Sequence, residues 1–100
     1  MSELNINKSV TIDALQVISV ERNNGNGTRK AFLIQNTSLL GEKISVSIGA
    51  EAVLGAGIVL SPGGVWSDTA DSGYLPTQQQ ITAIASAITA TLAIQERVEA

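Results

Sequence analysis

Residues 29–64 read RKAFLIQNTSLLGEKISVSIGAEAVLGAGIVLSPGG, and this stretch is the centre of the chain, with strand-like runs on a short length of sequence. Three runs rich in aliphatic and β-branched residues, 31–35, 44–48 and 58–60, are separated by segments rich in Asn, Ser, Gly and Pro. The middle run, ISVSI, has the period-2 alternation of a strand with one face in the core. The first run is nearly continuous in apolar residues, which predicts a strand buried on both faces. The stretch therefore indicates a mostly β domain.

Strand patterns continue on both sides of this stretch. Residues 9–21 predict one bent strand or two short ones, and residues 65–69 predict another short strand. Between 9–21 and the central stretch, residues 22–27 read RNNGNG, the strongest turn signal in the chain. Because Asn-Gly pairs adopt positive φ at low cost, this segment predicts a hairpin between two antiparallel strands.

Two segments have less certain patterns. Leu39 and Leu40 follow a polar break and are expected to fold back over an edge of the core. In the last quarter, apolar residues recur at helical spacing, yet residues 81–85 and 90–95 also alternate as strands do. The density of Ile and Thr favours strands, since β-branched side chains are restricted in helices. We predict a hairpin that turns near Ser86 and Ala87, with a helix as the alternative.

The composition restricts the possible functions. The 100 residues suffice for one domain, and they carry a net charge of -3 with 15% charged residues. An acidic chain of this kind lacks the basic surface that binds nucleic acid. The chain has no apolar stretch of the roughly 18 residues that span a bilayer, and its first residues do not resemble a secretion signal. We therefore expect neither a nucleic-acid nor a membrane partner.

The residue types also bear on catalysis. The chain has no Cys and no His, so hydrolytic triads that use these residues and ordinary zinc sites are excluded. Asp68 and Asp71 are the nearest carboxylate pair, but they lie in a Ser- and Gly-rich loop, where solvated carboxylates are usual. Their spacing also lacks the other ligands of a calcium loop. We expect no enzymatic activity, no metal and no cofactor.

Four apolar residues are candidates for protein contact. Residues 1–12 alternate around Leu4 and Ile6 and predict an extended N-terminal arm, followed by a β-sandwich domain over residues 13–100. Leu4 and Ile6 would anchor this arm. Trp66 is the largest anchor in the chain; closing the end of the core is the favoured interpretation, and an interface hot spot is the alternative. Tyr74 lies in the polar loop that follows and is the fourth candidate.

The order of these elements resembles the small β-rich virion proteins encoded in many tailed and related phage genomes. The resemblance covers about the last seventy residues and departs from the pattern at residues 86–88, where a Gly-Thr turn is usual. The residues that carry it are Arg29, Phe32-Leu33-Ile34-Gln35-Asn36-Thr37-Ser38, Ile44-Ser45-Val46-Ser47-Ile48-Gly49, Gly57-Ile58-Val59-Leu60-Ser61-Pro62-Gly63-Gly64, Ile81-Thr82-Ala83-Ile84-Ala85 and Leu92-Ala93-Ile94-Gln95-Glu96.

The resemblance implies a structural protein of the virion, assembled in the host cytoplasm, that decorates or cements the capsid or forms part of a vertex or fibre. Its partners would be the major capsid protein and copies of itself, with a trimer as the favoured oligomer. The expected fold is a single antiparallel β-sandwich of about seven or eight strands, of the jelly-roll or Ig-like type. The alternative function is that of a carbohydrate-binding module, for which Trp66 and Tyr74 are the only candidate aromatic pair.

Overall fold

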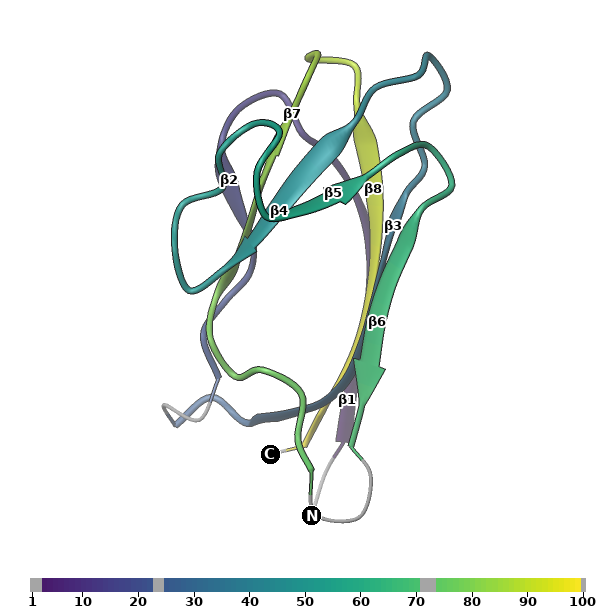
Figure 1. The fold of residues 1–100 in the computed structure, drawn as a ribbon. Helices are drawn as coiled ribbons and strands as arrows, with labels where there is room; N and C mark the ends of the chain where they lie inside the picture. Colours follow the sequence, from purple (N-terminus) through teal and green to yellow (C-terminus); the bar gives the residue numbers. More distant parts are fainter. Residues whose placement is uncertain (1–2, 23–24, 71–73, 100) are drawn as a thin grey trace.

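The computed structural model describes residues 3–22, 25–70 and 74–99, and the fold is all-β over these residues (Figure 1). The three runs of the central stretch, residues 31–35, 44–48 and 58–60, all lie in strands, as predicted. The strands are β1 (Glu3–Thr11), β2 (Gln16–Ser19), β3 (Thr28–Asn36), β4 (Ile44–Ile48), β5 (Ile58–Leu60), β6 (Val65–Thr69), β7 (Ile81–Ala85) and β8 (Thr91–Glu99).

The strands form two antiparallel sheets, sheet A in the order β1-β8-β3-β6 and sheet B in the order β2-β7-β4-β5. The pairs β1·β8, β2·β7, β3·β6 and β4·β5 are nested, as if one long hairpin had been rolled up. This is the strand arrangement of a jelly roll, in which two Greek keys form a double sheet. The predicted antiparallel β-sandwich is confirmed.

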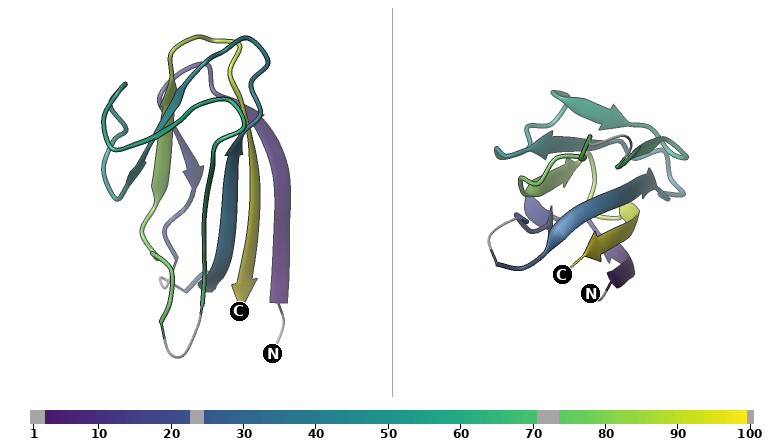
Figure 2. Two further views of the ribbon diagram at one scale, coloured as in Figure 1. Left: turned by 45° about the vertical axis from the view of Figure 1, so that its right-hand side comes forward. Right: turned by 90° about the horizontal axis from the view of Figure 1, so that it is seen from below.

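The core lies between the two sheets, which face each other as layers in Figures 1 and 2. Ile34 and Ile94 from sheet A meet Val46 and Ile81 from sheet B, and all four are fully buried. With only one Phe and one Trp in the chain, aliphatic side chains fill most of this space. Each one stabilises the fold by about 1.5–3 kcal/mol through burial.

The N-terminal segment belongs to sheet A. It is extended, as predicted, but it pairs with β8 from Glu3↔Glu99 to Thr11↔Thr91 and so forms an edge strand instead of an arm outside the sandwich. Its inward row includes Ile6 and Val10, which lie opposite Glu96 and Leu92. The physical reason is that alternation around Leu4 and Ile6 suits a half-covered edge strand as well as a free arm.

Two predicted hairpins are wrong. The turn at residues 22–27 connects β2 in sheet B to β3 in sheet A, and the segment 86–90 connects β7 in sheet B to β8 in sheet A. The last quarter is nevertheless two strands and not a helix. Turn residues specify a local change of direction, whereas the choice of partner strand depends on contacts that are distant in sequence.

Residues 31–35 were predicted to be buried on both faces, and this prediction is wrong. Phe32 and Ile34 are buried in the core, while Leu33 points to the outer face and is 37% exposed. The reason is that no layer of the described residues covers the outer face of sheet A at this position, so a central strand of this sheet has one open face.

A β-bulge in β3 directs Arg29 into the interior. Arg29 pairs with Val98 and Ala31 pairs with Arg97, so Lys30 is the extra residue between two regular pairs. Without the bulge, Arg29 would share the outward face of Ala31, because side chains alternate along a strand. A second register shift in β2, between Val17 and Ser19, accompanies the burial of Ser19.

The β4–β5 loop, residues 49–57, covers part of the outer face of sheet B. The Gly55 N–H donates to Ser45 Oγ at 2.8 Å, and Thr82 Oγ1 donates to the Ala50 carbonyl at 2.7 Å. Both Ser45 and Thr82 are buried as a result, although they lie on the side of the sheet away from the core. This loop leaves sheet A as the sheet with the open outer face.

Candidate functional site

The end of the sandwich that carries the β3–β4 and β7–β8 loops presents exposed apolar side chains. Leu39 is 93% exposed, Leu40 is 77% exposed and Ile88 is 73% exposed. These loops lie at the top of Figure 1, opposite the chain termini. We call Leu39, Leu40 and Ile88 the apolar tip. The expectation that Leu39 and Leu40 fold over an edge of the core is wrong, because they project into solvent instead.

One carboxylate ties the two loops of the apolar tip together. Glu42 Oε1 accepts a hydrogen bond from the Leu40 N–H at 2.9 Å, and Glu42 Oε2 accepts one from Thr89 Oγ1. The Thr89 hydroxyl and the nearby backbone N–H groups hold the pKa of Glu42 below its ordinary value. Lys43 and Ser86 add two further bonds, Lys43 N–H to Ser86 Oγ and Ser86 N–H to the Lys43 carbonyl, both at 3.0 Å.

Asn36 fixes the base of the same loop. Its fully buried amide donates to the Glu42 carbonyl at 2.9 Å and to the Leu60 carbonyl at 2.8 Å, and its oxygen accepts from the Ser38 N–H at 2.9 Å. The sequence indicated only that Asn36 and Ser38 break a strand. In the fold, the amide satisfies backbone groups that would otherwise be buried without partners. The apolar tip therefore stands on a well-bonded base.

The candidate residues Leu4 and Ile6 lie on β1, toward the chain termini and far from the apolar tip (Figure 1). Leu4 is 58% exposed and Ile6 is partly buried. Trp66 lies on β6, the opposite edge strand of sheet A. Within one copy of the chain, the structure does not bring these two groups of candidates together.

Trp66 packs against the core. Its ring meets that of Phe32 edge-on, with centroids 4.6 Å apart and planes at 70°. This is a favourable aromatic geometry, and it matches the favoured interpretation of Trp66 as a residue that closes the core. Among the described residues, it is the only ring contact, so Trp66 and Tyr74 do not form a stacked pair.

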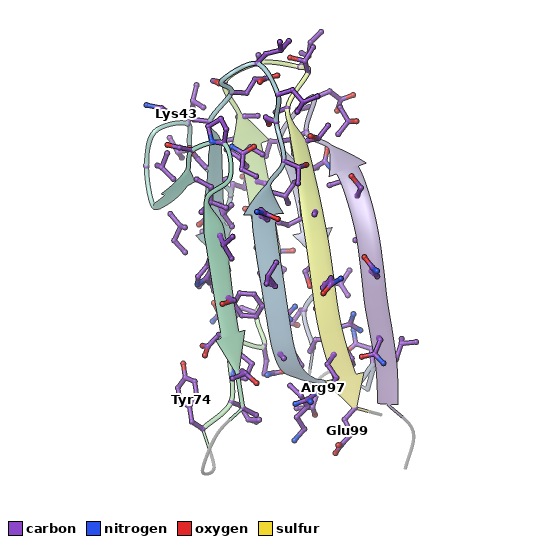
Figure 3. The ribbon with its side chains drawn as sticks, turned by 90° about the vertical axis from the view of Figure 1, so that its right-hand side faces the viewer. Lys43, Tyr74, Arg97 and Glu99 are labelled. Atoms are coloured by element: carbon purple, nitrogen blue, oxygen red, sulfur yellow. The ribbon has the colours of Figure 1, made fainter. Side chains whose placement is uncertain are left out.

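Tyr74 is exposed beside the end of β6, as Figure 3 shows. Its hydroxyl donates to Asp68 Oδ2 at 3.0 Å, and the carboxylate raises the pKa of Tyr74 by this bond and by its charge. Asp71, the other carboxylate of the predicted pair, lies outside the described residues. The described part of the chain contains no group of three or more side chains suited to hold a metal. It also contains no helix long and apolar enough to cross a membrane.

A buried ionic cluster, which was not predicted, lies between the two sheets. Arg29 is fully buried, and its Nε donates to Glu96 Oε2 at 2.9 Å, while Ser19 Oγ donates to Glu96 Oε1 at 2.8 Å. The remaining guanidinium bonds are Nη1 to the carbonyls of Thr77 (2.5 Å) and Gln79 (3.1 Å), and Nη2 to Ser19 Oγ (2.6 Å) and the Val20 carbonyl (2.9 Å).

This cluster is a structural clamp. A guanidinium has five N–H donors, and all five are used by protein acceptors here, so none is left for a ligand. The bonds join β3 and β8 of sheet A to β2 and to the segment before β7 of sheet B. The only signal for the cluster in the sequence was that Arg29 and Glu96 are the first and last residues of the resemblance described above.

No protein-family model matches the chain, and no curated protein matches it in sequence.

Proposed function

We propose that this chain is a structural subunit of a phage virion that binds and stabilises the capsid shell, as a decoration, cement or vertex protein. The observation that carries the proposal is the apolar tip, because its side chains are 73–93% exposed. Exposed apolar patches on small proteins commonly mark surfaces that bind another protein. The resemblance to phage virion proteins supplies the class of partner.

The energetics favour docking of the apolar tip into a recess of a partner. Burial of three aliphatic side chains yields roughly 5–9 kcal/mol before the cost of association. The bonds around Glu42 and Asn36 hold the loops in place, which reduces the entropy lost on binding. A capsid offers many equivalent sites, so a small oligomer could engage several of them and gain avidity.

The edges of sheet A support self-association. β1 and β6 are its two edge strands, and on their outer edges the described residues have no strand partner. Along the order β1-β8-β3-β6 the strands alternate in direction, so β1 of one copy would run antiparallel to β6 of the next. Such a head-to-tail contact forms a closed ring when the rotation between successive copies is an exact fraction of a full turn, and a trimer is the favoured ring.

This ring would unite the four candidate residues. Leu4 and Ile6 of one copy would lie along the edge that carries Trp66 and Tyr74 in the next copy. The proposed contact therefore explains why the candidates lie on opposite edges of one sheet. An exposed edge strand is otherwise a liability for aggregation, and a closed ring removes it.

The test uses shells of the phage that encodes the chain, prepared without this protein. Purified chain is added back and co-sedimentation is measured for the wild type and for a Leu39→Ser/Leu40→Ser/Ile88→Ser variant. The control is Val53→Ser/Leu54→Ser in the β4–β5 loop, where the side chains are 64% and 53% exposed. We expect the wild type and the control to bind and the tip variant to lose binding. Wild-type protein that fails to bind shells would overturn the proposal.

A further inference from the structure

The outer face of sheet A forms a hollow of about 630 Å³ that lies apart from the apolar tip. All four strands of the sheet contribute to it, and Figure 3 views this face directly. From the structure we infer that this hollow binds a neutral oligosaccharide through the amide and hydroxyl side chains that line it.

The register places the lining residues in two outward rows. One row is Asn5–Arg97–Ala31–Thr69 and the next is Asn7–Gln95–Leu33–Ser67, each written from β1 to β6. The alternate row, Ile6–Glu96–Phe32–Asp68, points to the other side of the sheet and contributes main chain to the floor.

The chemistry of the outward rows suits sugar hydroxyl groups. Asn5, Asn7 and Gln95 each offer an amide donor and an amide acceptor, and Ser67 and Thr69 each add a hydroxyl that serves as both. A sugar hydroxyl both donates and accepts hydrogen bonds, so it needs an acceptor and a donor from the protein. Asn5, Asn7, Gln95, Ser67 and Thr69 are therefore the residues that we assign to hydrogen bonding with the ligand.

The shape and charge of the hollow favour an uncharged ligand. Leu33, one of the lining residues and 37% exposed, provides an apolar surface for the C–H groups of a sugar ring. Neither row contains a carboxylate, and the one cation, Arg97, has Glu99 two residues further along β8 on the same face. Figure 3 labels both at the lower end of the sheet. The volume lies in the range of small-molecule sites and exceeds what a single sugar ring fills.

This site differs from the aromatic pair expected for a carbohydrate-binding module. Trp66 pairs with the fully buried Ile34 and so points to the core side of sheet A, away from the hollow. Recognition would rest on hydrogen bonds over a rigid strand surface instead of aromatic stacking. The inference is independent of capsid binding, because the hollow does not include the apolar tip.

The test is an NMR titration of the amide resonances with a panel of neutral di- to tetrasaccharides. We expect shifts confined to the outer rows of β1, β8, β3 and β6 for at least one sugar. The Asn7→Ala/Gln95→Ala variant should weaken that binding about tenfold or more, which corresponds to about 1.4 kcal/mol. Gln80→Ala, an amide immediately before β7 in sheet B, is the matched control and should bind as the wild type does.

Three results would overturn the inference. They are the absence of shifts with every sugar of the panel, shifts centred on Trp66 and Tyr74, and unchanged affinity in the Asn7→Ala/Gln95→Ala variant. Thermal unfolding of both variants verifies that they are folded. Since the two substituted side chains point to solvent, we expect their stability to change by less than about 0.5 kcal/mol.

Discussion

Arg29 and Glu96 form an ion pair in the interior, with Arg29 Nε 2.9 Å from Glu96 Oε2 and side chains 0% and 2% exposed. The two residues lie on neighbouring strands of sheet A, and Arg29 also bonds to Ser19 and Val20 of the region around β2 in sheet B. A bulge at Lys30 is what turns Arg29 toward this partner. The pair therefore joins two neighbouring strands of sheet A, and the other bonds of Arg29 connect this sheet to sheet B.

Removal of one partner of this pair is expected to destabilise the fold strongly. Arg29→Met should lower the free energy of unfolding by about 3–5 kcal/mol, because it leaves the Glu96 carboxylate buried without its counter-charge. Denaturant unfolding followed by the fluorescence of Trp66, the only tryptophan, measures this change. The double variant Arg29→Met/Glu96→Leu should lose less than the sum of the two single variants.

The control for the ion pair is Lys43→Met, at an exposed position (Figure 3). This substitution should change the free energy of unfolding by no more than about 0.5 kcal/mol. Equal effects of Arg29→Met and Lys43→Met would show that the buried pair does not hold the sheets together.

The titration of Tyr74 should report its bond with Asp68. Asp68 stabilises the neutral phenol and so raises the pKa of Tyr74 above its ordinary value of 10.0. Asp68→Asn should lower that pKa toward 10.0, since the charge is lost. Because Tyr74 is the only tyrosine, the phenolate absorbance in the ultraviolet reports this residue alone. An unchanged midpoint in Asp68→Asn would contradict the contact.

Acid should weaken the base of the apolar tip through Glu42. The folded-state pKa of Glu42 lies below 4.5, so its contribution to stability is complete above about pH 4.5 and is lost as pH falls through the lowered pKa. Thr89→Val removes the strongest cause of that shift. The difference in unfolding free energy between the wild type and Thr89→Val should therefore be largest above pH 4.5 and shrink in acid.

Carbon-13 NMR of the Glu42 carboxyl group provides a direct measurement of the same effect. Its midpoint should rise in Thr89→Val and stay unchanged in Thr11→Val, a control on the exposed end of β1. A midpoint that does not move in Thr89→Val would show that the hydroxyl does not control the ionisation of Glu42.

Two glycines of the β2–β3 connection should differ in their tolerance of a side chain. Gly25 and Gly27 have φ of 82° and 102°, where an L-residue is strained by about 1–2 kcal/mol. A Cβ at Gly27 would also lie 2.7 Å from Val98 Cγ1, whereas one at Gly25 has no neighbour within 4 Å among the residues that the structure describes. Gly27→Ala should thus destabilise by about 1–3 kcal/mol more than Gly25→Ala in denaturant unfolding. Equal losses would exclude the contact with Val98.

The local pattern of the sequence predicted most of the strands. The alternation in residues 44–48 corresponds to β4, and the runs before and after Pro62 correspond to β5 and β6. The segments rich in Gly, Asn, Ser and Pro were also correctly predicted to separate strands. They did not predict which strands pair, and the two expected hairpins are in fact crossings between the sheets.

The candidate sites were less predictable. Leu39 and Leu40 have the composition of core residues, and only the loop geometry around Glu42 places them in solvent. Trp66 was a candidate by size alone, and its edge-on contact with Phe32 arises from the pairing of β3 with β6. The hollow on sheet A involves residues from four strands, which no local pattern connects.

The β-rich character of the chain and its lack of His and Cys chemistry follow from the residues alone, because strand alternation and residue inventory are local properties. Only the three-dimensional fold establishes the nested jelly-roll pairing, the burial of Arg29 beside Glu96, the exposure of the apolar tip and the open face of sheet A. These features depend on strand register and on contacts between segments that are distant in sequence. A change of register by one residue at Lys30, for example, would turn the side chain of Arg29 to the opposite face of the sheet.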